Sequence, residues 1–257
     1  MPDDLHIAAH GHVRVLEIRR PPYNYFDLNL IRAIADGLDA ADADPECRAV
    51  VLAAEGKAFC AGADFAAGQE ATPEARKTRT AALYHEAERL FSSRKPIVAA
   101  IQGAAIGGGL GLALAADFRI ACPEARFSAN FTRLGFHPGF GLTVTLPDLI
   151  GDNRAALMFL TSRRITGEEA LAIGLVNQLV SQAEIRSAAL ALAAEIAECA
   201  PLALISTRAT LRAGLAGRVA RATEHELQEQ SWLRETEDFR EGVKSSAERR
   251  PGNFLGR

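Results

Sequence analysis

Two glycine-rich turns constrain the fold of this chain most, because each follows an apolar run and precedes a helix-like segment. The first, GKAFCAGAD (56–64), comes after AVVLAA (49–54), and the second, the glycines at 107–109, comes after IVAAIQG (97–103). Short apolar runs of this kind are typical of strands that are buried on both faces. The repeated order of strand, glycine turn and helix predicts an α/β fold.

The segments around the two turns extend this pattern. VRVLEI (13–18) predicts a strand, Asp27 is placed to cap the helix that follows it, and the apolar spacing over 73–92 predicts a long helix. A further helix is expected over 110–116 and a strand over 118–122. The first half of the chain is therefore expected to alternate strands and helices.

The last third of the chain changes character. From Glu184 onward the sequence is nearly all helix-like, with a thin apolar stripe that includes Trp232 and Phe239. We expect this stripe to pack on the core or on a sister subunit rather than to bind a ligand. The simplest division is an α/β core over 1–183 with a C-terminal helical module over 184–257.

The composition is that of an ordinary globular protein, with 48% hydrophobic and 24% charged residues among 257. The 29 basic and 32 acidic residues nearly cancel to −3, so we expect no nucleic acid partner. No apolar run of about 18 residues and no signal peptide occurs, so no membrane association is expected.

Four cysteines without C-x-x-C spacing predict neither zinc nor disulfides and fit a cytoplasmic location. The histidines at 6, 10 and 12 lie in a segment expected to be mobile and exposed rather than metal-binding.

Neither glycine turn matches a phosphate-binding loop. G-x-G-x-x-G fails because leucine stands where the last glycine is needed, and G-x-x-x-x-G-K-[ST] fails because Ala58 follows Gly56-Lys57. The chain also has no G-x-S-x-G and no H-E-x-x-H. Backbone N–H groups at a helix start are unpaired and can hold an anion, and two that converge would form an oxyanion hole.

The same residues carry a resemblance to a known family. FCAGADF (59–65) with KPIVAAIQGAAIGGGLGLALAADFRIA (95–121) resembles the enoyl-CoA hydratase/isomerase (crotonase) superfamily. The similarity continues through ARFSANFTRLGFHPGFG (125–141) and ITGEEALAIGLVNQLV (165–180) and ends at EGVKSSAERRPGNFLGR (241–257). Several linked motifs in one order and spacing are far more specific than any one alone.

The resemblance implies a crotonase-like spiral of ββα units with a C-terminal helical trimerisation module, in a homotrimer or a dimer of trimers. It implies acyl-CoA substrates and no cofactor, since CoA is part of the substrate. The shared chemistry is a thioester enolate held by two backbone N–H groups, which here belong to Ala63 and Gly108. Ala61, Asp64 and Phe65 would line the path of the CoA arm, although Asp64 is also placed to cap a helix.

The chain departs from this family at the acid and base. Hydratases of the family use two glutamates, at positions that are Gly111 and Phe131 here, and some relatives use an aspartate where Gly139 stands. None of these three residues can move a proton. The sequence therefore predicts an enolate-stabilising site without the usual acid/base pair.

Two residues are candidates to replace the missing pair. His137 lies on the segment that supplies the catalytic acid in relatives, and a histidine suits proton transfer near neutral pH; the alternative is a loop histidine bonded to backbone. Tyr84 is expected to face the acyl pocket, because counting back from Pro96 turns it inward rather than His85; the alternative is core packing. Asn130 is a candidate to bind water or a substrate carbonyl.

Phe131 and neighbouring phenylalanines suggest an apolar pocket for the acyl group, although aromatic residues at such spacing also serve as core. Three functions remain open at this point. The first is hydration or double-bond isomerisation of an enoyl-CoA with a substitute acid/base, the reading we expect for the family. The second is decarboxylation or C–C bond cleavage of a β-keto acyl-CoA. The third is a non-catalytic acyl-CoA binder.

Overall fold

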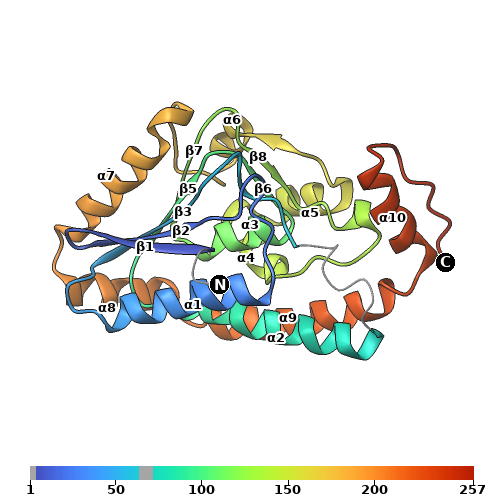
Figure 1. Cartoon of the computed structure of the whole chain (residues 1–257), viewed down its shortest axis with the longest axis horizontal. Coiled ribbons are helices and arrows are strands. Elements are labelled where there is room, and N and C mark those ends of the chain that lie inside the picture. Colours follow the sequence, from blue (N-terminus) through green and yellow to red (C-terminus); the bar gives the residue numbers. More distant parts are fainter. Residues whose placement is uncertain (1–3, 64–71) are drawn as a thin grey trace.

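The main chain repeats one unit, in which a strand of a large sheet is followed by a short strand of a small sheet and then by helix (Figure 1). The computed structural model describes residues 4–63 and 72–257. The strands are β1 Leu5–His10, β2 Val13–Ile18, β3 Ala49–Ala54, β4 Ala58–Cys60, β5 Ile97–Ile101, β6 Ala104–Ile106, β7 Phe118–Ala121, β8 Arg126–Ser128, β9 Ile165–Thr166 and β10 Gln178–Leu179. The helices are α1 Leu28–Ala43, α2 Pro73–Ser92, α3 Gly108–Ala115, α4 Leu142–Ile150, α5 Asp152–Thr161, α6 Gly167–Ala172, α7 Ile185–Ala197, α8 Pro201–Leu211, α9 Leu215–Leu233 and α10 Glu237–Ala247, with 3-10 turns η1 Thr132–Leu134 and η2 Gln182–Glu184.

Within the described residues the large sheet has the order β1-β2-β3-β5-β7-β10 and the small sheet the order β4-β6-β8-β9. All pairings are parallel except β1 with β2 and β8 with β9. Because β3, β5 and β7 lie in the large sheet while β4, β6 and β8 follow them in the small one, the chain advances as a spiral. The expected spiral of ββα units is confirmed.

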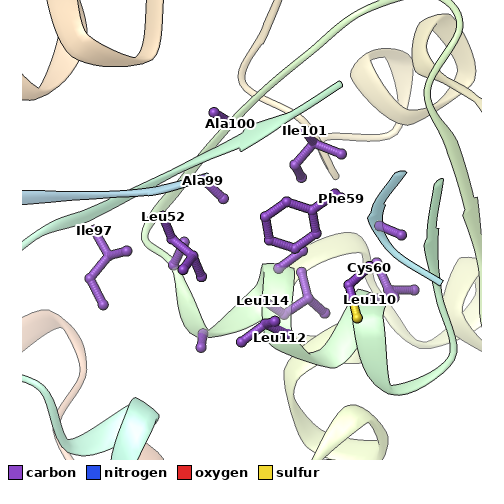
Figure 2. Close-up of a cluster of buried hydrophobic side chains, with 14 of the residues drawn as sticks. Leu52, Phe59, Cys60, Ile97, Ala99, Ala100, Ile101, Leu110, Leu112 and Leu114 are labelled. Carbon is purple, nitrogen blue, oxygen red and sulfur yellow. The ribbon is translucent and has the colours of Figure 1, made fainter. Parts of the chain in front are cut away.

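The core lies between the two sheets and is filled by α3 (Figure 2). Leu52, Phe59 and Ile101 come from strands, and Leu110 and Leu112 from α3; each is at most 2% exposed. A helix that is apolar on every side must be enclosed, and every residue of α3 after Gly108 is buried. The start of α3 is thereby held between sheets with little freedom to move.

Two boundaries differ from the sequence expectations. Leu5–His10, expected to be mobile, is strand β1, which pairs with β2 from Leu5↔Ile18 to His10↔Val13. This pairing uses backbone hydrogen bonds alone, so the side chains of His6 and His10 stay exposed. The helix expected over 110–116 begins at Gly108, because Gly107 has a positive φ of 56° that turns the chain directly into it.

The C-terminal helices pack tightly against the core. α7 covers the large sheet, α9 runs along α2, and α10 packs on η1 (Figure 1). Asp117, which precedes β7, accepts hydrogen bonds from Arg208 at 2.9 and 3.0 Å and from Arg212 at 3.1 Å. This ion-pair cluster attaches α8 to the edge of the sheet. Among the described residues no single helix is long and apolar enough to cross a membrane, although the bent pair Gln182–Ala197 and Pro201–Leu211 passes that test together.

Candidate active site

The two glycine turns lie side by side. β4 and β6 are parallel neighbours, with Ala58 paired to Ala104 and Cys60 paired to Ala105. Since both strands end at the same edge of the small sheet, the turns that follow them meet there. A Cβ on Gly109 would lie 2.1 Å from the carbonyl oxygen of Cys60, so only glycine allows this approach.

Ala63 of the first turn and Gly108 of the second each carry a backbone N–H group. Gly108 is the first residue of α3, where an N–H has no partner within the helix. Ala63 forms an isolated parallel bridge with Phe26. Within the parts of the chain that the structure describes, neither the N–H of Ala63 nor that of Gly108 donates a hydrogen bond. Both residues are half-buried, so the two donors are available to a ligand.

A cavity of about 420 Å³ is lined by both turns, including Ala63 and Gly108. It is bounded by the two turns, by the side of α2, by the segment before α4, and by the ends of α9 and α10. Six of the site residues predicted from the sequence line this cavity: Ala61, Ala63, Tyr84, Gly108, Asn130 and Phe131. The structure therefore brings together predicted residues from three separate motifs.

Three predicted residues are not placed in the cavity. Asp64 and Phe65 lie outside the described residues. His137 is half-buried but does not line the cavity; its Nδ1 contacts the carbonyl oxygen of Pro138 at 2.9 Å, and its ring packs edge-on against His225 at 5.7 Å. A loop histidine bonded to backbone was the alternative to a catalytic His137 in the sequence analysis, and the structure shows such a contact. The catalytic role of His137 stays a prediction.

Aromatic rings form one wall of the cavity. Phe26 and Phe140 have ring centroids 5.5 Å apart, Phe131 and Phe136 are 5.4 Å apart, and Phe136 and Phe239 are 5.4 Å apart. The last two pairs pack edge to face, a favourable arrangement for aromatic rings. The wall is an apolar surface on which an acyl chain can lie.

Neighbouring side chains fill the space beside Gly111 and Gly139, two positions at which the resemblance leads us to expect no carboxylate. A Cβ on Gly111 would lie 2.8 Å from Cβ and Cδ1 of Phe140. A Cβ on Gly139 would lie 2.0 Å from the hydroxyl of Tyr84 and 2.5 Å from Nε2 of Gln230. A glutamate or aspartate at these positions would therefore have to displace Phe140 or Tyr84.

Tyr84 lines the cavity and brings an uncharged titratable group, its phenol, to it. Its side chain is 7% exposed, whereas His85 points to solvent, as expected from the sequence. The hydroxyl donates to Oε1 of Gln230 at 3.0 Å, and Nε2 of Gln230 donates to the carbonyl oxygens of His137 (2.9 Å) and Pro138 (3.2 Å). Burial, together with the nearby charge of Glu226, raises the pKa of the Tyr84 phenol well above its usual range. Tyr84 therefore remains a protonated donor at any ordinary pH.

Both carboxylates that line the described part of the cavity are already engaged. Asp27 caps α1 by accepting the N–H of Leu30 at 2.9 Å and lies 3.1 Å from Nη1 of Arg20. Burial opposes ionisation of Asp27, but the Leu30 N–H and the Arg20 guanidinium outweigh it, and its pKa lies below the usual range. Glu235 lies 3.1 Å from Nη1 of Arg76. Neither carboxylate is free to act as a base.

The sequence argument missed the contribution of the C-terminal helices. Gln230 of α9, its C-cap residue Arg234 and Phe239 of α10 line the cavity, although the apolar stripe of this region was expected to pack on the core or on a sister subunit. Gln230 and Arg234 are four residues apart and so share one helix face. That spacing was a visible signal, but only the packing of α9 along α2 shows that this face meets the cavity.

Comparisons with known proteins agree with this architecture. The model of the enoyl-CoA hydratase/isomerase family matches residues 8–257. A crotonyl-CoA hydratase from Syntrophomonas wolfei is 34% identical over 95% of this chain and 94% of its own length, and a carnitinyl-CoA dehydratase from Salmonella paratyphi A is 32% identical over the full length of both. The crystal structure of an enoyl-CoA hydratase/isomerase from Pseudoalteromonas atlantica covers 98% of this chain and all of its own with a TM-score of 0.87 at 28% identity. The chain is thus a member of the enoyl-CoA hydratase/isomerase family.

Proposed function

We propose that this protein is an acyl-CoA enzyme that stabilises a thioester enolate between the backbone N–H groups of Ala63 and Gly108. The support is their position: both line one cavity, neither donates elsewhere in the described chain, and Gly108 begins a helix whose dipole favours negative charge. Fixed donors aimed at a developing oxyanion contribute about 3 kcal/mol each to transition-state stabilisation. In this proposal Ala61 borders the CoA arm, and Asn130 and Phe131 border the acyl group; the resemblance implies a place along the CoA arm for Asp64 and Phe65 as well, which lie outside the described residues.

We further propose that the enolate forms by loss of CO2 from a 2-carboxyacyl-CoA. The observation that carries this choice is the filled space at Gly111 and Gly139, which leaves Tyr84 as a proton donor and, among the residues that the structure describes, no unpaired carboxylate as a base. In the reaction the bond between Cα and the carboxyl carbon breaks, its electron pair passes to the thioester enolate, and CO2 leaves. Tyr84 then gives its proton to Cα and is reprotonated from solvent. A thioester enolate is far more basic than a phenolate, so this transfer is downhill even from a weakly acidic phenol.

Hydration or isomerisation of an enoyl-CoA is the second candidate, because a crotonyl-CoA hydratase and a carnitinyl-CoA dehydratase are similar to this chain over nearly its whole length. Hydration needs a group that takes a proton from the attacking water. In the described cavity this group would have to be a second water, held by Asn130 or by the Tyr84–Gln230 pair, or else His137 after a rearrangement.

One panel of substrates separates the candidates. Methylmalonyl-CoA tests decarboxylation through the appearance of propionyl-CoA, acetoacetyl-CoA tests C–C cleavage, and crotonyl-CoA tests hydration through loss of the enoyl-thioester absorbance. Turnover of methylmalonyl-CoA that falls by about 10²-fold or more in Tyr84→Phe, with Tyr23→Phe as the control at an exposed tyrosine, is the expected result. Turnover of crotonyl-CoA alone would favour hydration instead. Tight binding of all three esters without product would identify a non-catalytic binder.

We also propose that the chain assembles as a homotrimer or a dimer of trimers. Support comes from large apolar side chains on the outside of the described chain, among them Leu160, Leu202 and Leu211, which are 77%, 81% and 81% exposed. Burial of these side chains against other copies would remove apolar surface from water and so favour assembly. Light scattering on the purified protein would give three or six times 27.5 kDa, and a monomer mass would contradict the proposal.

A further inference from the structure

Arg234 lies against the aromatic wall at Phe136 and is separated from the glycine turn at Gly107 by the rings of Phe131 and Phe136. The Cβ position of Gly107 is 3.7 Å from Cζ of Phe131, the ring of Phe131 packs on Phe136, and the guanidinium of Arg234 lies 5.3 Å above the ring of Phe136. A second chain of contacts leads from the same region through Tyr84 and Gln230 to Arg234. An acyl chain that starts at the two N–H groups and follows this wall ends at Arg234.

The guanidinium of Arg234 has only neutral partners. Nη2 lies 3.2 Å from Oε1 of Gln230 and Nη1 lies 3.4 Å from Oγ1 of Thr80, both long contacts. Nε is buried and has no hydrogen-bond partner, and no carboxylate of the described chain lies within 4 Å of this side chain. Burial lowers the pKa of Arg234; Tyr84 opposes this, and the positive charges of Arg76 and Arg79 add to it. The side chain is half-buried, and a partly desolvated charge without a carboxylate partner is stabilised by a ligand that pairs with it.

Other positive charges lie near Arg234. Arg76 and Arg79 line the same cavity and are close enough to lower the pKa of Arg234. Glu235, a carboxylate that lines the described cavity next to Arg234 in the chain, is paired with Arg76. An anion is the ligand that this end of the cavity favours.

We infer that the acyl group of the substrate ends in a carboxylate that binds Arg234, at the end of the acyl group remote from the thioester. Under the decarboxylation proposed above, this carboxylate is additional to the 2-carboxylate that leaves as CO2. This inference rests on the proposed acyl-CoA function. The planar guanidinium offers two parallel N–H donors that match the two oxygens of a carboxylate, and the weak contacts to Thr80 and Gln230 are readily exchanged for such a pair. The aromatic wall between the turns and Arg234 suits the methylene chain that joins the thioester to the carboxylate.

A phosphate of CoA is another source of negative charge, and binding measurements separate it from an acyl carboxylate. We would titrate the protein by calorimetry with succinyl-, glutaryl- and adipyl-CoA, each against the uncharged ester of equal chain length: butyryl-, valeryl- and hexanoyl-CoA. These saturated esters carry no 2-carboxylate and no double bond, so binding is measured without turnover. The paired variants are Arg234→Gln and Arg133→Gln, the latter an exposed arginine outside the cavity lining.

At least one charged ester is expected to bind about tenfold or more tightly than its uncharged match, since a charge-assisted pair is worth at least that factor. Arg234→Gln should remove this preference while leaving uncharged esters within about threefold of their original affinity, and Arg133→Gln should keep the preference.

The inference is overturned if the wild-type protein shows no preference for charged over uncharged esters, a result that needs no variant to fold. It is also overturned if the preference survives Arg234→Gln, or if that variant weakens charged and uncharged esters alike, as loss of a CoA phosphate contact would. Equal binding of all esters overturns this inference alone, whereas no binding of any ester overturns the proposed function as well.

Discussion

The hydroxyl of Tyr84 and the amide oxygen of Gln230 are joined by a 3.0 Å hydrogen bond that connects α2 of the core to α9 of the C-terminal helices. The pair also fills the space beside Gly139, where a Cβ would lie 2.0 Å from the Tyr84 hydroxyl. The position of the Tyr84 hydroxyl beside Gly139 is therefore fixed by a contact between two parts of the chain.

Substitution of Gly139 by alanine should move Tyr84. We expect Gly139→Ala to lose most turnover on whichever acyl-CoA the protein uses, and to lower the free energy of unfolding by about 1–3 kcal/mol, the usual cost of overpacking. In the Tyr84→Phe background the obstructing hydroxyl is gone, so the stability cost of Gly139→Ala should be smaller. A double-mutant cycle by urea denaturation measures this coupling; strictly additive effects would show that Gly139 and Tyr84 do not compete for space.

Addition of a side chain at Gly111 should strain the packing of Phe140. We expect Gly111→Ala to destabilise the protein by about 1–3 kcal/mol, because its Cβ would lie 2.8 Å from Phe140 in a fully buried helix. Gly217→Ala is the matched control in α9, where the nearest atom is the Arg221 Nη1 at 3.7 Å; there alanine should stabilise by about 0.5–1 kcal/mol. Thermal or urea unfolding of the two variants gives the comparison. Equal stability changes would mean that Phe140 yields without cost.

The raised pKa of Tyr84 makes stability depend on pH in the alkaline range. The folded protein holds the phenol proton more tightly than the unfolded chain does, so the contribution of Tyr84 is constant below about pH 10, the usual tyrosine pKa, and is lost as pH rises above it. We expect the wild-type protein to lose stability relative to Tyr84→Phe between about pH 10 and 11. Urea denaturation of both proteins across this range measures the difference, and parallel curves would argue against the buried, neutral phenol.

Removal of the Asp117 carboxylate should loosen α8. Asp117 accepts from Arg208 and Arg212 and also from the N–H of Ile97 at 2.8 Å, and Arg208 is only 7% exposed. Breaking a buried ion pair leaves an uncompensated charge, so Asp117→Asn should cost about 3–5 kcal/mol. Asp148→Asn breaks an exposed pair with Arg218 and should cost less than about 1 kcal/mol. If the two variants unfold at the same urea concentration, the cluster does not hold α8 to the sheet.

The sequence predicted features that depend on local residue types and failed where distant segments meet. Asp27 was expected to cap a helix and does so, since a cap needs only its own N–H groups a few residues ahead. The spiral of ββα units followed from linked motifs. Gln230 and Arg234 were not expected in the cavity, because their position depends on how α9 crosses α2. Strand β1 was missed because LHIAAH carries little buried apolar surface and is held by backbone pairing with β2.

The order in which parts of the cavity occur along the chain bears on how the protein is made. Both glycine turns are synthesised in the first half, whereas Gln230, Arg234 and Phe239 come near the end. A ribosome has therefore released the sheets and α3 long before the last wall of the cavity exists. The emerging core must hold itself together without help from a bound acyl-CoA, and only the finished chain can be protected by its ligand against unfolding or proteolysis.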